Sequence, residues 1–265
     1  MNSSKEKISA LIITYNEIGF IEKCIQSIDF ADEIIVVDSF STDGTYEYLA
    51  NLDNVKVIQH PFDNFTLQKS FALKQASNDW VLFLDADEVV TKNLKSEILN
   101  TLNSNPEHSA YWFYRKFMFQ NKSLLFSGWQ TDKNYRLFRK SKVKFSEEKL
   151  VHETLDVNGS SGILNEKLVH YCYKNFEEYK EKMISYGRLK AKESFFKEKK
   201  FNYFYMIMKP SWKFFHRYLL RLGILDGKKG IIICYLDALG VLERFRELKK
   251  LENNNDLAYY LAMPE

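Results

Sequence analysis

Two aspartates, Asp85 and Asp87, follow the apolar run Trp80–Leu84 with one residue between them. Such a run predicts a buried strand, so both carboxylates emerge at a strand end. Paired carboxylates repel each other unless a cation joins them, and Mg²⁺ or Mn²⁺ binds oxygen ligands together with substrate phosphates. The pair therefore predicts a divalent metal beside a diphosphate, although an Asp-x-Asp pair alone is also typical of an ordinary acidic loop.

Two further polar segments, 14–17 and 38–45, also follow predicted strands. Ligands of an open parallel sheet bind outside the carboxyl ends of its strands. Taken singly, Asn16 and Asp43 are equally suited to cap helices. Acidic strand ends that the predicted topology brings side by side favour a shared site.

The sequence contains neither a P-loop nor a Gly-x-Gly-x-x-Gly motif, so other groups must hold a nucleotide. Asp38 can accept a hydrogen bond from a base N–H. Glu17 can reach ribose hydroxyls or the base edge.

Apolar strands alternate with amphipathic helices through the first hundred residues, which predicts an α/β fold with a mainly parallel sheet covered on both faces. From Ala110 the sequence consists of alternating segments rich in aromatic residues, and this pattern predicts mixed or antiparallel strands added to this sheet. After about Tyr173 the pattern is helical, and we expect these helices to pack on the sheet domain. The predicted strands are Ile8–Thr14, Glu33–Asp38, Val55–Gln59 and Trp80–Leu84, and the predicted helices are Ile18–Ile28, Gly44–Leu52, Phe65–Ala76, Leu94–Leu102, Phe176–Lys200, Tyr203–Leu222 and Gly230–Leu251.

Charge is unevenly distributed although the net charge is only +3: residues 1–170 carry 19 basic and 23 acidic side chains, whereas residues 171–250 carry 19 and 9. A basic, aromatic block suggests an anionic partner, either a lipid surface or a nucleic acid.

Three scattered cysteines predict neither a disulfide framework nor a metal site, and favour a reducing compartment. No run is long enough for a transmembrane helix, and the apolar run at 8–13 is too short for a signal peptide.

Cations recur every four residues from Lys209 to Arg221, next to large aromatic side chains. This pattern predicts a helix lying in a membrane interface with its cations on anionic head groups. The alternative is a helix that packs on the sheet and leaves its cations solvated. No nucleic-acid-binding motif is present, so we expect no nucleic acid partner.

The ordered set of motifs resembles the family 2 glycosyltransferases of GT-A fold, and within them the branch of lipopolysaccharide-core β-1,4-glucosyltransferases. The resemblance spans almost the whole chain, and the set is far more specific than any one motif. The matching segments are 8–17, 36–45, Gln68-Lys69, 80–88, 136–139, 151–153 and 223–230.

The resemblance implies that Asp87 is the direct metal ligand, that Asp85 faces the ribose or the metal, and that the metal is Mn²⁺ or Mg²⁺. It places the uridine on the first two strand ends and the phosphates or sugar near Gln68 and Lys69. The donor-binding residues implied are Thr14, Tyr15, Asn16, Glu17, Asp38, Ser39, Gln68, Lys69, Asp85 and Ala86.

Inversion at an anomeric carbon needs a general base that deprotonates the incoming hydroxyl. Glu153 resembles the acceptor-side carboxylate of the family, with His152 as its neighbour or as a phosphate contact. An ordinary strand-end hydrogen-bond pair is the alternative, and Asp132 and Glu148 are reserve candidates for the base.

An acceptor subsite is predicted at Trp129, which can stack on a sugar, and Arg136, which can bind a carboxylate or phosphate. Core packing is the alternative role for Trp129.

The sequence thus predicts a GT-A domain at 1–173, with a nucleotide-sugar-binding half at 1–104 and an acceptor half at 105–173, and a membrane-associating helical region at 174–265. The expected activity is inverting transfer of a hexose, with glucose as the first choice, from a UDP-sugar to a glycan or lipid-linked acceptor of the cell envelope. The expected location is cytoplasmic, peripheral on the inner face of the cytoplasmic membrane. The alternatives are a sugar nucleotidyltransferase, which normally has a Gly-rich loop after its first strand, and a non-catalytic sugar-nucleotide or glycolipid binding protein.

Overall fold

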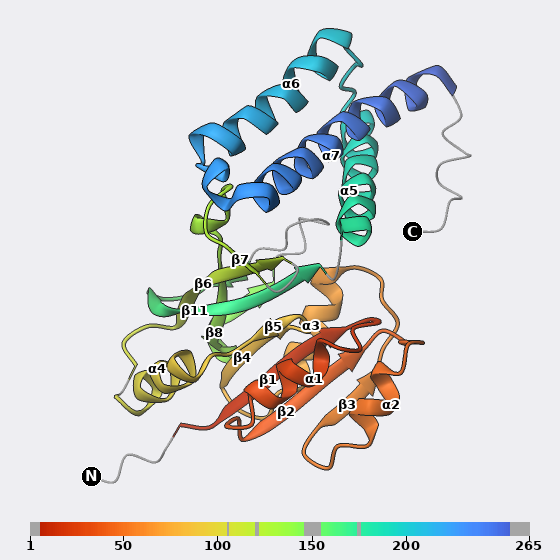
Figure 1. Cartoon of the computed structure of the whole chain (residues 1–265). Coiled ribbons are helices and arrows are strands. Elements are labelled where there is room, and N and C mark those ends of the chain that lie inside the picture. The colour runs from red at the N-terminus through yellow and green to blue at the C-terminus, as the bar shows by residue number, and fades with distance from the viewer. Residues whose placement is uncertain (1–5, 105, 120–121, 146–154, 174–175, 255–265) are drawn as a thin grey trace. The chain divides into compact units, whose positions relative to one another are not determined.

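The computed structural model describes residues 6–254 except 105, 120–121, 146–154 and 174–175 (Figure 1). The chain forms two compact units, which we describe separately. Unit 1 contains residues 1–116 and 131–171, and unit 2 contains residues 117–130 and 172–265.

The parallel part of the sheet in unit 1 has the strand order β3-β2-β1-β4. Thr14 of β1 pairs with Asp38 of β2, and Ile13 pairs with Asp85 of β4. Because parallel neighbours end at the same edge, the polar residues after these strands share one edge of the sheet. The strands are β1 (Ile8–Thr14), β2 (Glu33–Asp38), β3 (Lys56–Gln59) and β4 (Trp80–Asp85).

Both faces of this parallel part are buried. Alternate residues of β1 point to opposite faces: Ala10 and Ile12 pack in one hydrophobic cluster with α1, α2 and α4, whereas Leu11 packs in a second cluster with α3. This arrangement confirms the predicted α/β fold. The helices are α1 (Ile21–Ser27), α2 (Thr45–Ala50), α3 (Phe65–Gln75) and α4 (Lys92–Asn103).

Antiparallel strands extend the sheet beyond β4 in the order β8-β6-β11-β5, with β7 paired to β6. The predicted addition of mixed strands after residue 110 is therefore confirmed, although β5 and β11 bring residues 80 positions apart together. The elements are β5 (Glu88–Val89), β6 (Ala110–Phe119), β7 (Lys122–Leu124), β8 (Lys133–Arg139), β11 (Ser161–Tyr173), the two-stranded sheet of β9 (Val143–Phe145) and β10 (Leu155–Val157), and the short 3-10 helices η1 (Trp129–Thr131) and η2 (Lys140–Lys142).

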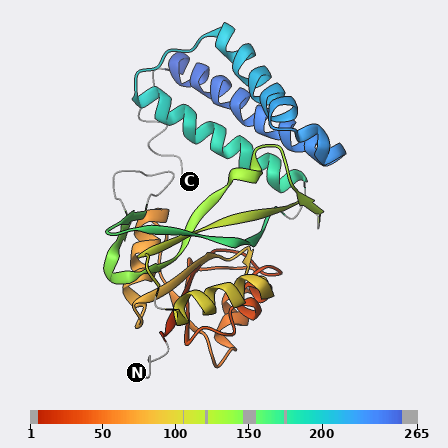
Figure 2. The ribbon, with the colours of Figure 1, turned by 90° about the vertical axis from the view of Figure 1, so that its left-hand side faces the viewer.

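In unit 2 the three long helices lie side by side (Figures 1 and 2). A Cβ atom on Gly187 of α5 would lie 2.5 Å from the carbonyl oxygen of Gly240 in α7, so these two helices approach through glycine. Among the described residues, no helix is both long and apolar enough to cross a membrane. The helices are α5 (Phe176–Phe196), α6 (Tyr203–Phe215), the π-helical turn η3 (His216–Leu220), the 3-10 turn η4 (Gly223–Asp226) and α7 (Gly227–Asn254).

Candidate active site

The loops after β1 and β2 are joined by side-chain hydrogen bonds. Asn16 N donates to Ser41 Oγ at 2.9 Å, and Thr42 N donates to Asn16 Oδ1 at 2.8 Å. Asn16 has a φ of 56°, a left-handed conformation that an asparagine tolerates better than most residues. Asn16 therefore connects two loops instead of capping α1, whose N-cap is Phe20.

Asp43 also connects the two loops. Its carboxylate accepts hydrogen bonds from Ile18 N and from Thr45 N and Oγ1, and Thr45 Oγ1 in turn accepts from Glu17 N at 3.0 Å. Burial raises the pKa of Asp43, but the hydrogen bonds from Thr45 and Ile18 lower it by more, so its pKa lies below the usual value. An ionised Asp43 thus holds the backbone of the predicted donor loop.

Predicted nucleotide-binding side chains are brought together at the ends of β1 and β2. Asp38 is fully buried and accepts hydrogen bonds from the backbone N–H and hydroxyl of Ser41. Tyr15 is 57% exposed, which leaves its ring free to stack on a base. Thr14 Oγ1 is buried and has no hydrogen-bond partner among the described residues.

Gln68 and Lys69 are both buried, although they lie on a helix. Gln68 donates to Ser39 Oγ at 3.0 Å and contacts the His60 ring nitrogen Nδ1 at 2.8 Å, so its amide fixes the position of Ser39. Lys69 Nζ lies 3.8 Å from Asp85 Oδ1. The structure therefore places Lys69 beside the Asp85 carboxylate rather than on a solvated face, and its role toward the phosphates stays a prediction.

Asp85 is partly exposed and belongs to a network of ions in which Glu88 and Arg136 are buried. Arg136, which is 4% exposed, bonds both Asp85 and Glu88, with its Nη2 2.6 Å from Glu88 Oε1. Arg115 Nη1 lies 3.3 Å from Glu88 and its Nη2 lies 2.7 Å from Asp132. Each buried charge in this network has a partner, as burial of a charge requires.

The network fixes the ionisation of Asp85. Burial raises the pKa of this carboxyl group, but Arg136, followed by Lys69 and Arg115, lowers it by more, so the pKa lies far below the usual range. The pKa of Arg136 is raised in turn: burial lowers it, and Asp85 and Glu88 outweigh that effect. Asp85 is therefore an anion that cations of the protein already neutralise.

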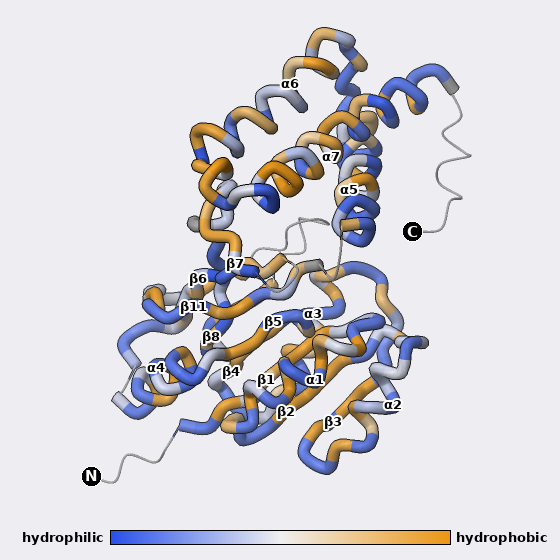
Figure 3. The backbone as a smooth tube through the Cα atoms, viewed as in Figure 1, coloured by the Kyte–Doolittle hydropathy of each residue, from blue (hydrophilic) through white to orange (hydrophobic). Residues whose placement is uncertain are grey.

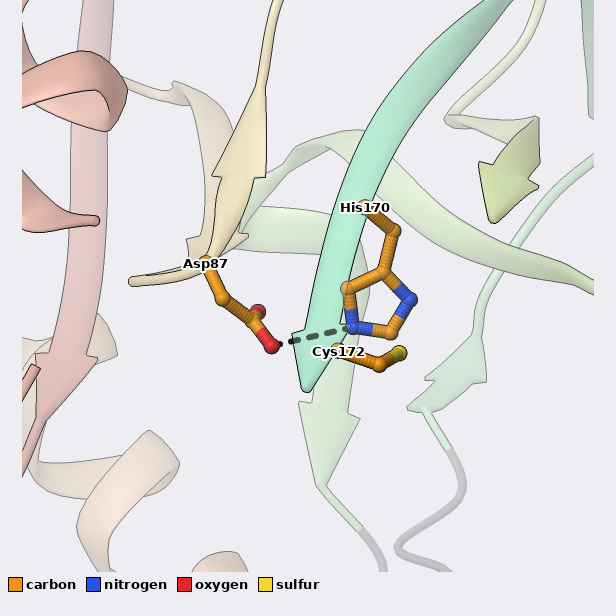
Figure 4. Close-up of side chains that lie close together, drawn as sticks. All are labelled: Asp87, His170 and Cys172. Atoms are coloured by element: carbon orange, nitrogen blue, oxygen red, sulfur yellow. Dashed lines mark ion pairs between the residues drawn. The ribbon is translucent and has the colours of Figure 1, made fainter. Parts of the chain in front are cut away.

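Asp87 is oriented differently from Asp85 and meets a histidine. Its Oδ2 lies 3.3 Å from Nε2 of His170, which comes from β11 (Figure 4). Both side chains are largely buried, and Cys172 follows two residues later on the same strand. A carboxylate oxygen and an imidazole nitrogen form a donor set that suits a transition-metal ion such as Mn²⁺.

Glu88, Arg115 and His170 were not among the predicted site residues. Glu88 could have been suspected, because it continues the acidic strand end after Asp87. Arg115 and His170 lie on antiparallel strands far along the chain, and no local pattern marks them.

Five predicted acceptor-side and base residues have different outcomes. His152, Glu153 and the reserve candidate Glu148 lie outside the described residues. Arg136, predicted to bind the acceptor, is buried in the ion network, and the reserve base Asp132 is held by two nitrogens of Arg115.

Trp129 belongs to unit 2. Its ring stacks on Phe117 with a centroid distance of 4.0 Å, and the Arg217 guanidinium lies 5.2 Å from the ring. Its Nε1 is buried without a hydrogen-bond partner among the described residues. These contacts show Trp129 packed within unit 2, and its acceptor role stays a prediction.

Sheets of this kind bind ligands at the carboxyl ends of their parallel strands. Comparison with known proteins identifies the family of the chain. The sequence model described as "Glycosyl transferase family 2" matches residues 9–155, more than half of the chain. The chain therefore belongs to glycosyl transferase family 2.

Relatives match over nearly their full length. An uncharacterized glycosyltransferase of Rickettsia conorii is 32% identical over 96% of this chain and 93% of its own. The lipopolysaccharide core biosynthesis glycosyltransferase LpsC of Rhizobium meliloti is 28% identical over 95% of this chain and 97% of its own. The resemblance to the lipopolysaccharide-core branch of the family is thus confirmed.

Among solved structures, S. aureus TarS in complex with UDP matches with a TM-score of 0.49 and 16% sequence identity, covering 94% of this chain and 92% of the TarS fragment.

Proposed function

We propose that this protein transfers a hexose, with glucose as the first choice, from a UDP-sugar to a glycan or glycolipid acceptor of the cell envelope, with inversion at the anomeric carbon. One observation carries the proposal: in this family 2 chain, strands β1, β2 and β4 end at the same edge of the parallel sheet. There the ends of β1, β2 and β4 gather a buried aspartate, a buried lysine and an Asp–His pair. Membership of the family and the similarity to LpsC support the reaction and the acceptor class.

In this proposal the ends of β1 and β2 bind the nucleoside. The Asp38 carboxylate accepts the N–H of the uracil base, Tyr15 stacks on the base, and the free hydroxyl of Thr14 bonds the nucleoside. Glu17 reaches the ribose, its backbone fixed by Thr45. Gln68 positions Ser39 next to these groups.

The diphosphate lies over β4 in this proposal. Lys69 binds the phosphates with its ammonium group. Asp85 is held by Arg136 and faces the ribose, and the backbone turn at Ala86 lies next to the donor. Asp87 and His170 would hold the metal, which would stabilise the negative charge that develops on the leaving diphosphate. Because one donor is an imidazole, we expect Mn²⁺ to be more effective than Mg²⁺, which prefers oxygen ligands.

The acceptor side retains Glu153 as the proposed general base, with His152 as its neighbour. Because Arg136 bonds both Asp85 and Glu88, we propose a positioning role for it toward Asp85. Trp129 remains the proposed stacking residue for an acceptor sugar. We also propose that the reaction takes place at the inner face of the cytoplasmic membrane, where lipid-linked acceptors are available.

The test is release of UDP from UDP-glucose by the purified protein, with Mn²⁺ and a cell-envelope glycolipid fraction. We expect Asp87→Ala to lower the rate by at least about 100-fold, since it removes a metal ligand. Asp53→Ala removes an exposed carboxylate in unit 1 and should leave the rate unchanged. Full turnover by the Asp87 variant would overturn the metal assignment.

The donor is tested by thermal shift with UDP-, GDP-, CMP- and dTDP-sugars, with and without Mn²⁺, because a ligand of the folded state raises the melting temperature. The largest shift is expected for UDP-sugars with Mn²⁺. Tight binding of a UDP-sugar without hydrolysis or transfer to any envelope acceptor would instead identify a binding protein.

A further inference from the structure

Helix α6 has an apolar face that the described residues of unit 2 do not cover. None of its described side chains is buried. Phe204, Met208, Trp212 and Phe215 recur at intervals of four and three residues, so they share one face of the helix, with Ile207 beside them. Their exposed fractions run from 48% for Met208 to 67% for Ile207.

The opposite face of α6 accounts for its contact with α7. The partly covered residues of α6 are Met206, Pro210, Lys213 and Phe214. Lys209 is exposed and lies at the border of this face, with its Nζ 5.6 Å from the ring centroid of Phe245 in α7. An amphipathic helix of a globular protein normally turns its apolar face inward. In α6 large apolar side chains also occupy the outward face.

Apolar residues continue along the chain through η3 and η4 into the start of α7 (Figure 3). Seven more large side chains of this segment are between 46% and 65% exposed. We call these residues, together with the outward face of α6, the apolar shelf. The added residues are Leu219, Leu220, Leu222, Ile224, Leu225, Ile231 and Tyr235. An exposed apolar surface of this extent marks a site of interaction with a protein or a membrane.

The charge of the same segment indicates which kind of partner binds this surface. Residues 203–236 contain six basic side chains and a single acid, Asp226. Asp226 is already engaged, because its carboxylate accepts hydrogen bonds from the backbone of Leu125 and Phe126 and from the hydroxyl of Ser127. Lys209 and Lys228 are exposed. The apolar shelf is therefore bordered by positive charge without an exposed acid of its own.

This combination disfavours a second copy of the chain as the occupant. A two-fold symmetric interface places the same patch on both subunits, so two strongly basic segments would face each other at a cost in repulsion. An anionic bilayer instead offers hydrocarbon to the apolar side chains and negative head groups to the cations.

We propose that the apolar shelf docks this protein on an anionic lipid bilayer, with α6 lying in the interface and Lys209 and Lys228 contacting head groups. Since no described helix is suited to span the membrane, the attachment is peripheral and reversible. The proposal stands on the exposure and charge of unit 2 and is independent of the chemistry proposed for unit 1.

The test is co-sedimentation of the full chain with phosphatidylcholine vesicles, with and without phosphatidylglycerol. We expect binding only to the anionic vesicles, and weaker binding at higher salt. The double variant Ile207→Gln/Phe215→Gln should bind at least about tenfold more weakly, because it removes two large apolar side chains from the surface that enters the bilayer. Lys209→Gln/Lys228→Gln should also weaken binding by at least about tenfold, because it removes two cations from the anionic head groups.

The matched control is Ile163→Gln/Leu189→Gln, which also removes two exposed apolar side chains but lies outside the apolar shelf. It should bind like the wild type, and unchanged thermal melting should show that all variants fold. Equal binding by the Ile207/Phe215 variant, or no binding to anionic vesicles, would overturn the proposal. The wild-type protein could instead self-associate without binding vesicles. If the Ile207/Phe215 variant abolished that self-association, a second copy of the chain would be shown to cover the apolar shelf. UDP release is also measured with a soluble acceptor, which does not require membrane binding. A variant that loses vesicle binding but keeps this UDP release has lost membrane docking and not the activity of unit 1.

Discussion

Arg136 and Asp87 occupy neighbouring parts of unit 1, yet their surroundings leave them different roles. Arg136 contacts two carboxylates and has only 4% of its surface exposed, so it can orient Asp85 but offers little surface to an acceptor. Asp87 has a histidine as its neighbour, a pairing that a metal can use directly. The two aspartates of one motif thus have different partners, an arginine for Asp85 and a histidine for Asp87, and we expect them to differ in role.

Thr14→Val tests whether a free hydroxyl serves the donor. Thr14 Oγ1 is buried without a partner among the described residues, so its removal should leave the free energy of unfolding unchanged or raise it by up to about 1 kcal/mol. UDP affinity should fall about fivefold, the value of one hydrogen bond of about 1 kcal/mol. Isothermal calorimetry and urea unfolding provide the two measurements.

The matched control is Thr45→Val, whose hydroxyl accepts from Glu17 N and donates to Asp43. Loss of those bonds should cost about 1–3 kcal/mol of stability. A Thr14 variant that loses as much stability as the Thr45 variant, with unchanged UDP affinity, would contradict a donor role for Thr14.

Asp43→Ala tests the pH dependence of the loop. The pKa of Asp43 is lowered in the folded state, so its contribution to stability is present above the unfolded pKa of about 4 and is lost as pH falls through the folded pKa. At pH 7 the variant should lose about 1–2 kcal/mol, as expected for lost cap-like hydrogen bonds. The difference from wild type in urea unfolding should shrink toward pH 3, and a difference independent of pH would contradict this account.

At the scale of elements, the sequence predicted the parallel half of unit 1 well. Its strands are apolar runs of four to seven residues that end in polar residues, and β1 and β2 begin and end at the predicted residues. The end of β4 differs from the prediction by one residue, because Asp85 still belongs to the ladder with β1.

The antiparallel half could be predicted only as strands, without their partners. The pairing of β5 with β11 joins Glu88 to His170 across 82 residues. Residues so far apart meet through the topology of the sheet, which hydrophobic periodicity does not specify. For this reason Asp87 was predicted as a metal ligand while His170 was missed.

Gly187→Ala tests how α5 meets α7. Alanine in an exposed helix position stabilises by about 1 kcal/mol relative to glycine. At Gly187 the new Cβ would lie 2.5 Å from a backbone carbonyl of Gly240, which cannot rotate away as a side chain would. We therefore expect the opposite sign, a loss of about 1–3 kcal/mol, measured as a lower melting temperature.

The control for this substitution is Ser185→Ala, at an exposed position two residues earlier in α5. It should be neutral or slightly stabilising, because alanine is the better helix former. A Gly187 variant that melts above the wild type would show that α5 and α7 do not depend on their close approach.

At the scale of the whole molecule, chemistry and charge are divided between the two compact units. The carboxylates of the candidate active site lie in unit 1, whereas the apolar shelf and its cations lie in unit 2. The net charges of residues 1–170 and 171–250 already indicated this division. The sequence predicted a helix in a membrane interface but left packing on the sheet as the alternative, because the same helical spacing fits a helix buried against a sheet and one facing a membrane.

This division predicts that two ligands protect two separate sets of backbone amides from hydrogen exchange. UDP with Mn²⁺ should slow exchange in residues 14–18, 38–45 and 85–88, because these loops become ordered around the donor. Anionic vesicles should instead slow exchange in residues 203–235, where α6 and the start of α7 carry the apolar shelf. Asp87→Ala should remove only the first effect, and Ile207→Gln/Phe215→Gln only the second. Protection of α6 by UDP in the absence of vesicles would show instead that the donor contacts unit 2, and the assignment of donor binding to unit 1 alone would then be wrong.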